Sequence, residues 1–186
     1  MRPNRDARAH IAGMTTQTEK SDVSPVTLAT CVEQSLNSSL DGFDLKRARL
    51  YGVAVVDPQG VIESIDGALR ITFLAEHGDV YELLDAPTSA IARMFDAAVV
   101  LTCGWAAPIT GDDSTDRFDG PPSEHPLKRR VRLVVAVCDG GVGSVLRFAD
   151  TPEEVICDPG AARGSLADAV NSLWFDPPVV VPREGR

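Results

Sequence analysis

The feature that most restricts the fold of this chain is a pair of hydrophobic runs joined by a very short polar segment. The runs are Arg129–Cys138 and Val142–Phe148, both rich in valine, and only Asp139-Gly140-Gly141 separates them. Asp-Gly and Gly-Gly pairs readily adopt the positive φ angles of tight hairpin turns. The pattern therefore predicts an antiparallel β-hairpin, and with it a sheet made at least partly of hairpins.

Helices are predicted at the start, in the middle and at the end of the chain. Hydrophobic residues recur there at near-helical spacing, and Ser24-Pro25 is a typical helix start. The predicted helices are 25–40, Pro87–Asp96 and Gly164–Trp174. One further helical turn is predicted at 151–154, with the sequence Thr-Pro-Glu-Glu.

The other hydrophobic runs predict strands. One predicted hairpin consists of Leu50–Val56, the turn Asp57–Gly60 and Val61-Ile62. A second consists of Ala68–Leu74, the turn Glu76–Asp79 and Val80–Leu84. The run Ala97–Trp105 is so continuously apolar that we expect it to be covered on both faces.

These elements predict an α+β fold with a mainly antiparallel sheet and helices at start, middle and end. Over roughly residues 25–175 the order of elements resembles the layout of profilin-like folds, the group of small-molecule sensor and scaffold domains that includes PAS, GAF and roadblock domains. The resemblance concerns the order of elements alone.

Length and composition predict one folded unit. The chain has 186 residues, of which 44% are hydrophobic, which suits a single core. We expect a single domain over 24–176, a disordered N-terminal leader over 1–23 and a proline-rich tail over 177–186. Within the domain, 109–127 is predicted to be a long flexible loop.

The charge balance bears on the class of partner. The net charge is −9, which argues against nucleic acid because binding phosphates requires a basic surface. No apolar run approaches the roughly 20 residues that span a bilayer, and the arginine-rich start has no apolar signal core. We therefore expect a cytoplasmic protein without a membrane partner. The excess of arginine over lysine is typical of a GC-rich bacterial genome.

The cysteines carry the only catalytic hypothesis. Cys103 comes near the end of one predicted strand and His125 just before the next, so pairing of the two strands would bring a base towards a thiol. The alternative is a buried structural cysteine, because Cys103 follows three apolar residues and a threonine, and a reactive thiol needs an electropositive, partly exposed site. The sequence contains no phosphate-binding loop, dinucleotide fingerprint or nucleophile elbow.

No metal or cofactor is expected. The cysteines form no Cys-x-x-Cys pair, so a zinc site is not favoured. The acids of the long loop do not match a calcium-binding loop, because the required glycine and glutamate positions are missing. These acids are Asp112, Asp113, Asp116 and Asp119.

A basic stripe is the main candidate for ligand binding. Strand alternation would place Lys128, Arg130 and Arg132 on one face, where they could bind a small anionic ligand or an acidic partner. The alternatives are that the stripe neutralises the neighbouring acidic loop or protects an edge strand. Arg163, before the last predicted helix, could likewise help to hold an anion or could belong to a plain helix entry.

The sequence therefore predicts a non-catalytic domain that binds a protein partner or a small ligand in a regulatory or scaffold role. The alternative is a small cysteine-dependent enzyme that uses Cys103 and His125 for acyl transfer or hydrolysis. Trp105 and Trp174-Phe175 are the large residues expected at a pocket rim or an interface, and the second pair would fit a homodimer contact.

Overall fold

A computed structural model describes residues 23–39, 42–55, 69–107, 120–157 and 162–175 of the chain. Its helices, two of them 3₁₀ helices, are α1 (Pro25–Asn37), α2 (Val80–Asp85), η2 (Pro87–Met94), η3 (Pro122–Glu124) and α3 (Ser165–Phe175). Its strands are β1 (Ala48–Val55), β2 (Leu69–His77), β3 (Ala97–Ala106), β4 (Arg129–Cys138), β5 (Gly141–Phe148) and β6 (Thr151–Cys157).

The six strands form one antiparallel sheet in the order β2-β1-β3-β4-β5-β6. The predicted α+β fold with an antiparallel sheet and helices at start, middle and end is therefore confirmed. The Asp-Gly-Gly hairpin is also present, with Cys138 opposite Gly141 at the turn. Gly141 has a φ of 108°, a conformation that favours glycine.

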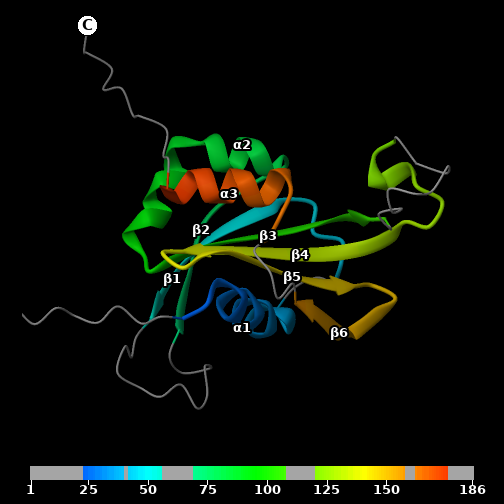
Figure 1. Ribbon diagram of the computed structural model, residues 1–186, viewed down its shortest axis with the longest axis horizontal. Helices are drawn as coiled ribbons and strands as arrows, with labels where there is room; N and C mark the ends of the chain where they lie inside the picture. Colours follow the sequence, from blue (N-terminus) through cyan, green and yellow to red (C-terminus); the bar gives the residue numbers. More distant parts are fainter. Residues whose placement is uncertain (1–22, 40–41, 56–68, 108–119, 158–161, 176–186) are drawn as a thin grey trace, which may run out of the picture.

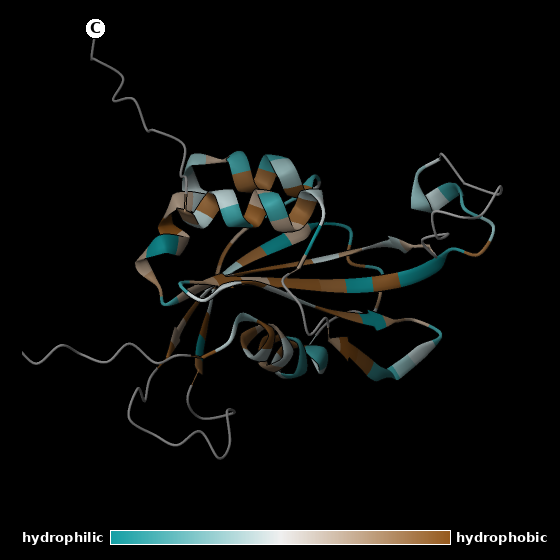
Figure 2. Cartoon of the chain, viewed as in Figure 1, coloured by the Kyte–Doolittle hydropathy of each residue, from teal (hydrophilic) through white to brown (hydrophobic). Residues whose placement is uncertain are grey.

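Helices cover both faces of the sheet, which gives three layers (Figure 1). Helix α1 packs on one face, mainly against β4 and β5, and α2, η2 and α3 lie on the other. Figure 2 shows mainly hydrophobic residues along the central strands, whereas the helices carry both hydrophobic and hydrophilic residues. Alternate residues of β4 serve the two layers, because Val134 and Ala136 belong to the core below α1, whereas Val135 and Val137 belong to the core below α3.

Two glycines allow the closest contacts between layers. A Cβ atom at Gly143 of β5 would lie 2.4 Å from the backbone nitrogen of Val26, so the start of α1 rests directly on this strand. A Cβ atom at Gly52 of β1 would lie 2.3 Å from the ring of Phe95. The helical layer on each face therefore contacts the sheet at a glycine, a position with no room for a larger side chain.

The predicted second hairpin is wrong, because Val80–Leu84 belongs to helix α2. The side chain of Asp79 accepts hydrogen bonds from the backbone N–H groups of Tyr81 and Glu82, which is the arrangement of a helix N-cap. Strand β2 instead pairs with β1. The expected partner of β1, Val61-Ile62, lies outside the described residues.

The predicted helical turn at 151–154 is also wrong, because these residues begin strand β6. This strand pairs with β5 on one side and is the last strand of the described sheet. Pro152 is compatible with such a position, since an edge strand does not need every N–H group for pairing.

The other predicted elements are present with small differences at their ends. Helices α1 and α3 match the first and last predicted helices, and the middle one is the 3₁₀ helix η2. The predicted leader except its last residue, most of the loop 109–127 and the tail lie outside the described residues. In the described part of the chain, no helix has both the length and the apolar character needed to cross a bilayer.

Candidate functional site

The predicted basic stripe runs along the N-terminal end of β4 on the face that α1 packs against. Figure 2 shows the change from hydrophobic to hydrophilic residues along this strand. Because β4 lies between β3 and β5, the idea that the stripe protects an edge strand is wrong. The three side chains have different surroundings: Arg132 is buried, Arg130 is half-buried and Lys128 is exposed.

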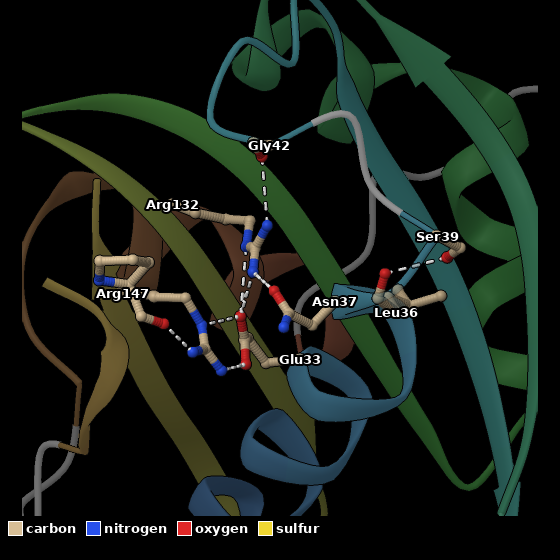
Figure 3. Close-up of polar contacts among 8 residues, drawn as sticks. Glu33, Leu36, Asn37, Ser39, Gly42, Arg132 and Arg147 are labelled. Atoms are coloured by element: carbon tan, nitrogen blue, oxygen red, sulfur yellow. Dashed lines mark hydrogen bonds and ion pairs between the residues drawn. The ribbon is translucent and has the colours of Figure 1, made fainter. Parts of the chain in front are cut away.

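Arg132 belongs to a buried ion network. Its Nη2 donates to Glu33 Oε1 at 2.6 Å, and its guanidinium also donates to Asn37 Oδ1 and to the carbonyl oxygen of Gly42. Arg147, its register partner on β5, donates from Nε and Nη2 to the two oxygens of the same Glu33 carboxylate, at 2.7 and 2.6 Å. Figure 3 shows the carboxylate between the two guanidinium groups.

This network keeps Arg132 buried and bonded to Glu33, away from the surface where a ligand would bind. Burial by itself would raise the pKa of Glu33, but the hydrogen bonds and charges of Arg147 and Arg132 outweigh burial and hold the pKa below its ordinary value. Glu33 is therefore ionised, and both arginines hydrogen-bond to its carboxylate. Arg132 is 1% exposed, and its hydrogen bonds to Glu33 connect α1 to the sheet.

Arg130 lies one step further along the stripe and has no carboxylate partner in the described part of the chain. Its Nε donates to the carbonyl oxygen of Phe43 at 3.0 Å, and its Nη1 donates to the carbonyl oxygen of Gly104 at 3.3 Å. The guanidinium carbon lies 5.4 Å from the centroid of the Trp105 ring, within the range of a cation–π contact. The positive charge of Arg130 is thus held in place by neutral groups.

Lys128 contacts the same tryptophan. Its Nζ lies 5.0 Å from the ring centroid of Trp105 and donates to the carbonyl oxygen of Ser123 at 2.6 Å. The indole of Trp105 is 42% exposed despite these two cations. We call Trp105, Lys128 and Arg130 the Trp105 surface.

The neighbouring Arg129 provides a useful contrast. It points to the opposite face, where its Nε donates to Asp150 Oδ2 at 2.8 Å and its guanidinium stacks on Phe148. The hydrogen bond from Arg129 lowers the pKa of the Asp150 carboxyl. Arg129 is therefore paired with a carboxylate, whereas no described carboxylate pairs with the two cations of the Trp105 surface.

Cys103 lies on the same face as the basic stripe, opposite Arg132 in the register of β3 and β4. Burial raises the pKa of its thiol. A backbone hydrogen bond from Leu45 and the charges of Arg130 and Arg132 act against this effect without overcoming it. The positive surroundings that the catalytic hypothesis requires are present, but the thiol remains protonated at neutral pH.

His125 directly follows η3, and its side chain is buried. Its Nδ1 accepts a hydrogen bond from the backbone N–H of Leu127 at 3.0 Å. A neutral imidazole whose Nδ1 accepts carries its proton on Nε2, so Nε2 is a donor in this arrangement and not a base. The structure therefore gives His125 a role in shaping the segment before β4.

The remaining sequence candidates lie apart from the Trp105 surface. Arg163 is exposed and lies two residues before α3, the helix that covers the other face of the sheet. Trp174 is 7% exposed and its Nε1 donates to Asp139 Oδ1 at 3.2 Å, so this tryptophan completes the core, while Phe175 beside it is 51% exposed.

No group of three or more His, Cys, Asp or Glu side chains in the described ranges is arranged to hold a metal ion. The four acids of the predicted loop, Asp112, Asp113, Asp116 and Asp119, lie outside those ranges.

Comparison with known proteins adds no family to this description. No protein-family model matches the chain, and neither the search of curated proteins nor that of solved structures found a similar protein.

Proposed function

We propose that this protein is a non-catalytic binding domain, of regulatory or scaffold type, that holds an anionic partner or ligand at the Trp105 surface. The observation that carries the proposal is an exposed indole contacted by two cations, Lys128 and Arg130, that have no carboxylate partner among the residues the structure describes. An aromatic ring beside available positive charge is suited to bind a group that is negatively charged and partly apolar.

The overall charge supports this assignment. The protein carries a net charge of −9, yet Lys128 and Arg130 lie together where their charges are not neutralised by any described residue. Elsewhere, Arg129 is paired with Asp150, and Arg132 and Arg147 share Glu33. Two cations around one indole, without a carboxylate partner among the described residues, are complementary to an anion.

The alternative of a cysteine-dependent enzyme has less support. A nucleophilic thiol needs a lowered pKa, whereas burial raises the pKa of Cys103. The hydrogen bond at Nδ1 of His125 also leaves the wrong nitrogen protonated for a base that acts through Nε2.

A titration of the tryptophan fluorescence tests the proposal. Phosphate, citrate, a nucleoside triphosphate and acidic peptides would be added to the wild type and to K128E/R130E. We expect at least one probe to change the fluorescence and raise the melting temperature of the wild type only, and less so at high salt. Equal responses of both proteins, or no response to any probe, would remove the support for this function. Light scattering of the same samples tests the predicted homodimer.

A further inference from the structure

One end of the Arg130 guanidinium is not used by the described residues. Its Nε donates to the carbonyl oxygen of Phe43, and its Nη1 donates to that of Gly104. Its Nη2 has no hydrogen-bond partner in the described part of the chain, and Nη1 keeps a second N–H group. The two carbonyl oxygens therefore fix the planar group, and its Nη1–Nη2 end can donate to a ligand.

The other arginines on the same two strands differ from Arg130. All three guanidinium nitrogens of Arg132 and of Arg147 donate to groups of the protein. Arg129 donates to the carboxylate of Asp150. Of the four arginines on β4 and β5, Arg130 is therefore the one that is held in place without a carboxylate of the described residues.

Lys128 supplies a second positive charge beside the same ring. Its Nζ has three N–H groups and donates to one described acceptor, the carbonyl oxygen of Ser123. The Nζ of Lys128 and the guanidinium carbon of Arg130 lie 5.0 and 5.4 Å from the ring centroid of Trp105, so the two charges are at most about 10 Å apart. Because a lysine side chain is flexible, one small anion can contact both cations.

These donors favour a phosphate monoester over a carboxylate. At neutral pH a phosphate monoester carries nearly two negative charges and three strong acceptor oxygens, which matches two cations around one ring. The planar end of a guanidinium binds two phosphate oxygens at once, and lysine binds phosphate as a point charge. A carboxylate has a single charge, so it would leave one cation without a counter-charge.

The exposed indole adds a requirement for the rest of the ligand. Trp105 is 42% exposed, and nucleobases stack on exposed aromatic side chains. When a base contacts the indole, Lys128 can leave its place over the ring and bind the phosphate, because its side chain is flexible. A ligand that uses all three groups therefore combines a phosphate with an aromatic ring.

We propose that the Trp105 surface binds a nucleoside monophosphate. The phosphate binds to the Nη1–Nη2 end of Arg130 and to Nζ of Lys128, and the base lies against the indole of Trp105. This proposal rests on the proposed function and specifies the anionic ligand as a small phosphate monoester that carries an aromatic ring.

Isothermal titration calorimetry with matched ligands tests the ligand class. Each of AMP, GMP and UMP would be compared with its nucleoside, with ribose 5-phosphate, which lacks the base, and with its phosphate methyl ester, which keeps one negative charge. We expect at least one nucleoside monophosphate to bind about tenfold more tightly than these three counterparts. Equal binding of ribose 5-phosphate would overturn the role of the base, and equal binding of the methyl ester would overturn the preference for a dianion.

Two adjacent arginines provide a matched pair of variants. R130Q and R129Q each remove one positive charge from β4, but Arg129 points to the opposite face and is paired with Asp150. We expect R130Q to weaken binding of the nucleoside monophosphate by about tenfold or more, and R129Q to change it by less than about twofold. Equal weakening by both variants would overturn the proposal.

Two further variants leave the hydrogen bonds of Arg130 intact. K128Q changes an exposed side chain and should weaken binding by about threefold or more. W105L should reduce the preference for the nucleoside monophosphate over ribose 5-phosphate, because the base loses its stacking partner. Full affinity in K128Q, or an unchanged preference in W105L, would overturn the proposed arrangement.

The failure of this inference can be told apart from failure of the proposed function. If citrate, an acidic peptide or a phosphotyrosine peptide binds the wild type but not K128E/R130E, and no nucleoside monophosphate does so, the Trp105 surface binds anions of another class. If no anionic probe distinguishes the two proteins, the proposed function fails as well.

Discussion

Arg132 and Arg147 are direct register partners on β4 and β5, and both hydrogen-bond to the single carboxylate of Glu33 on α1. Two like charges facing each other across neighbouring strands repel. The buried carboxylate of Glu33 compensates for this repulsion and connects α1 to both strands. This connection therefore depends on the negative charge of Glu33.

The variant E33Q tests this dependence. Glutamine has nearly the same size but leaves two arginines without their counter-charge, and Arg132 is almost completely buried. We expect the free energy of unfolding to fall by about 3–5 kcal/mol, measured by urea denaturation. The control E154Q, at an exposed glutamate on β6, should change it by less than about 0.5 kcal/mol.

The same carboxylate predicts an acid dependence. The pKa of Glu33 is lower in the folded protein than in the unfolded chain. The contribution of Glu33 to the free energy of unfolding is therefore fully present above the ordinary glutamate pKa of about 4.3, and it is lost as the pH falls through the folded pKa. The stability difference between wild type and E33Q should stay constant from pH 7 to about pH 5 and shrink at lower pH. A difference that grows towards acid would contradict this assignment.

The contact between α1 and β5 predicts an effect of a single methyl group. In G143A the new Cβ would meet the backbone of Val26 at 2.4 Å, and backbone cannot rotate away as a side chain can. We expect a loss of about 1–3 kcal/mol in the free energy of unfolding. G78A is the matched control, because a Cβ at Gly78 would meet nothing within 4 Å. Equal stability of both variants would show that α1 does not rest on Gly143.

Iodoacetamide labelling distinguishes the two roles considered for Cys103. Its thiol has a raised pKa, whereas Cys157 is exposed. Since the thiolate is the reactive form, Cys157 should be alkylated first in the native protein at pH 7.5, and Cys103 at a comparable rate only in urea. Mass spectrometry of the peptides identifies each site. Rapid native labelling of Cys103 that titrates below pH 8 would restore the enzyme hypothesis.

Quenching of tryptophan fluorescence probes the charge around Trp105. The chain has two tryptophans, of which Trp105 is exposed and Trp174 is nearly buried. Iodide should quench the Trp105 component more strongly in the wild type than in K128E/R130E, because cations beside the ring attract the anion. Neutral acrylamide should quench both proteins alike. A parallel loss with both quenchers would indicate that the double variant has altered the fold around the indole.

The parts of the fold that follow from local signals were predictable. The β4–β5 hairpin rests on Asp139-Gly140-Gly141, and the start of α1 rests on Ser24-Pro25, whose serine side chain accepts from the N–H of Thr27. Prediction failed where a local signal was overruled or overlooked. Asp79 signals a helix N-cap, but the apolar run after it resembled a strand. Pro152 suggested a helical turn, but pairing with β5 makes the segment an edge strand.

The candidate site was predictable only in part. Alternation along β4 correctly indicates that Arg130 and Arg132 share a face. It does not indicate that Arg132 is bonded within a buried ion network. The partner, Glu33, is 99 residues away in sequence, and no local spacing reveals it. A sequence signal did exist: Arg147 occupies the same alternation as the buried Val145 on β5, a position where an arginine requires a counter-charge.

The position of α1 in the chain has a consequence for biosynthesis. From β3 to β6 each strand pairs with the next one in the chain, so these contacts can form soon after each strand is made. Helix α1 is different, because Glu33 meets its partners 99 and 114 residues later. During translation α1 therefore leaves the ribosome long before the strands that bury it. Until then its apolar face stays in water, where it is accessible to a chaperone.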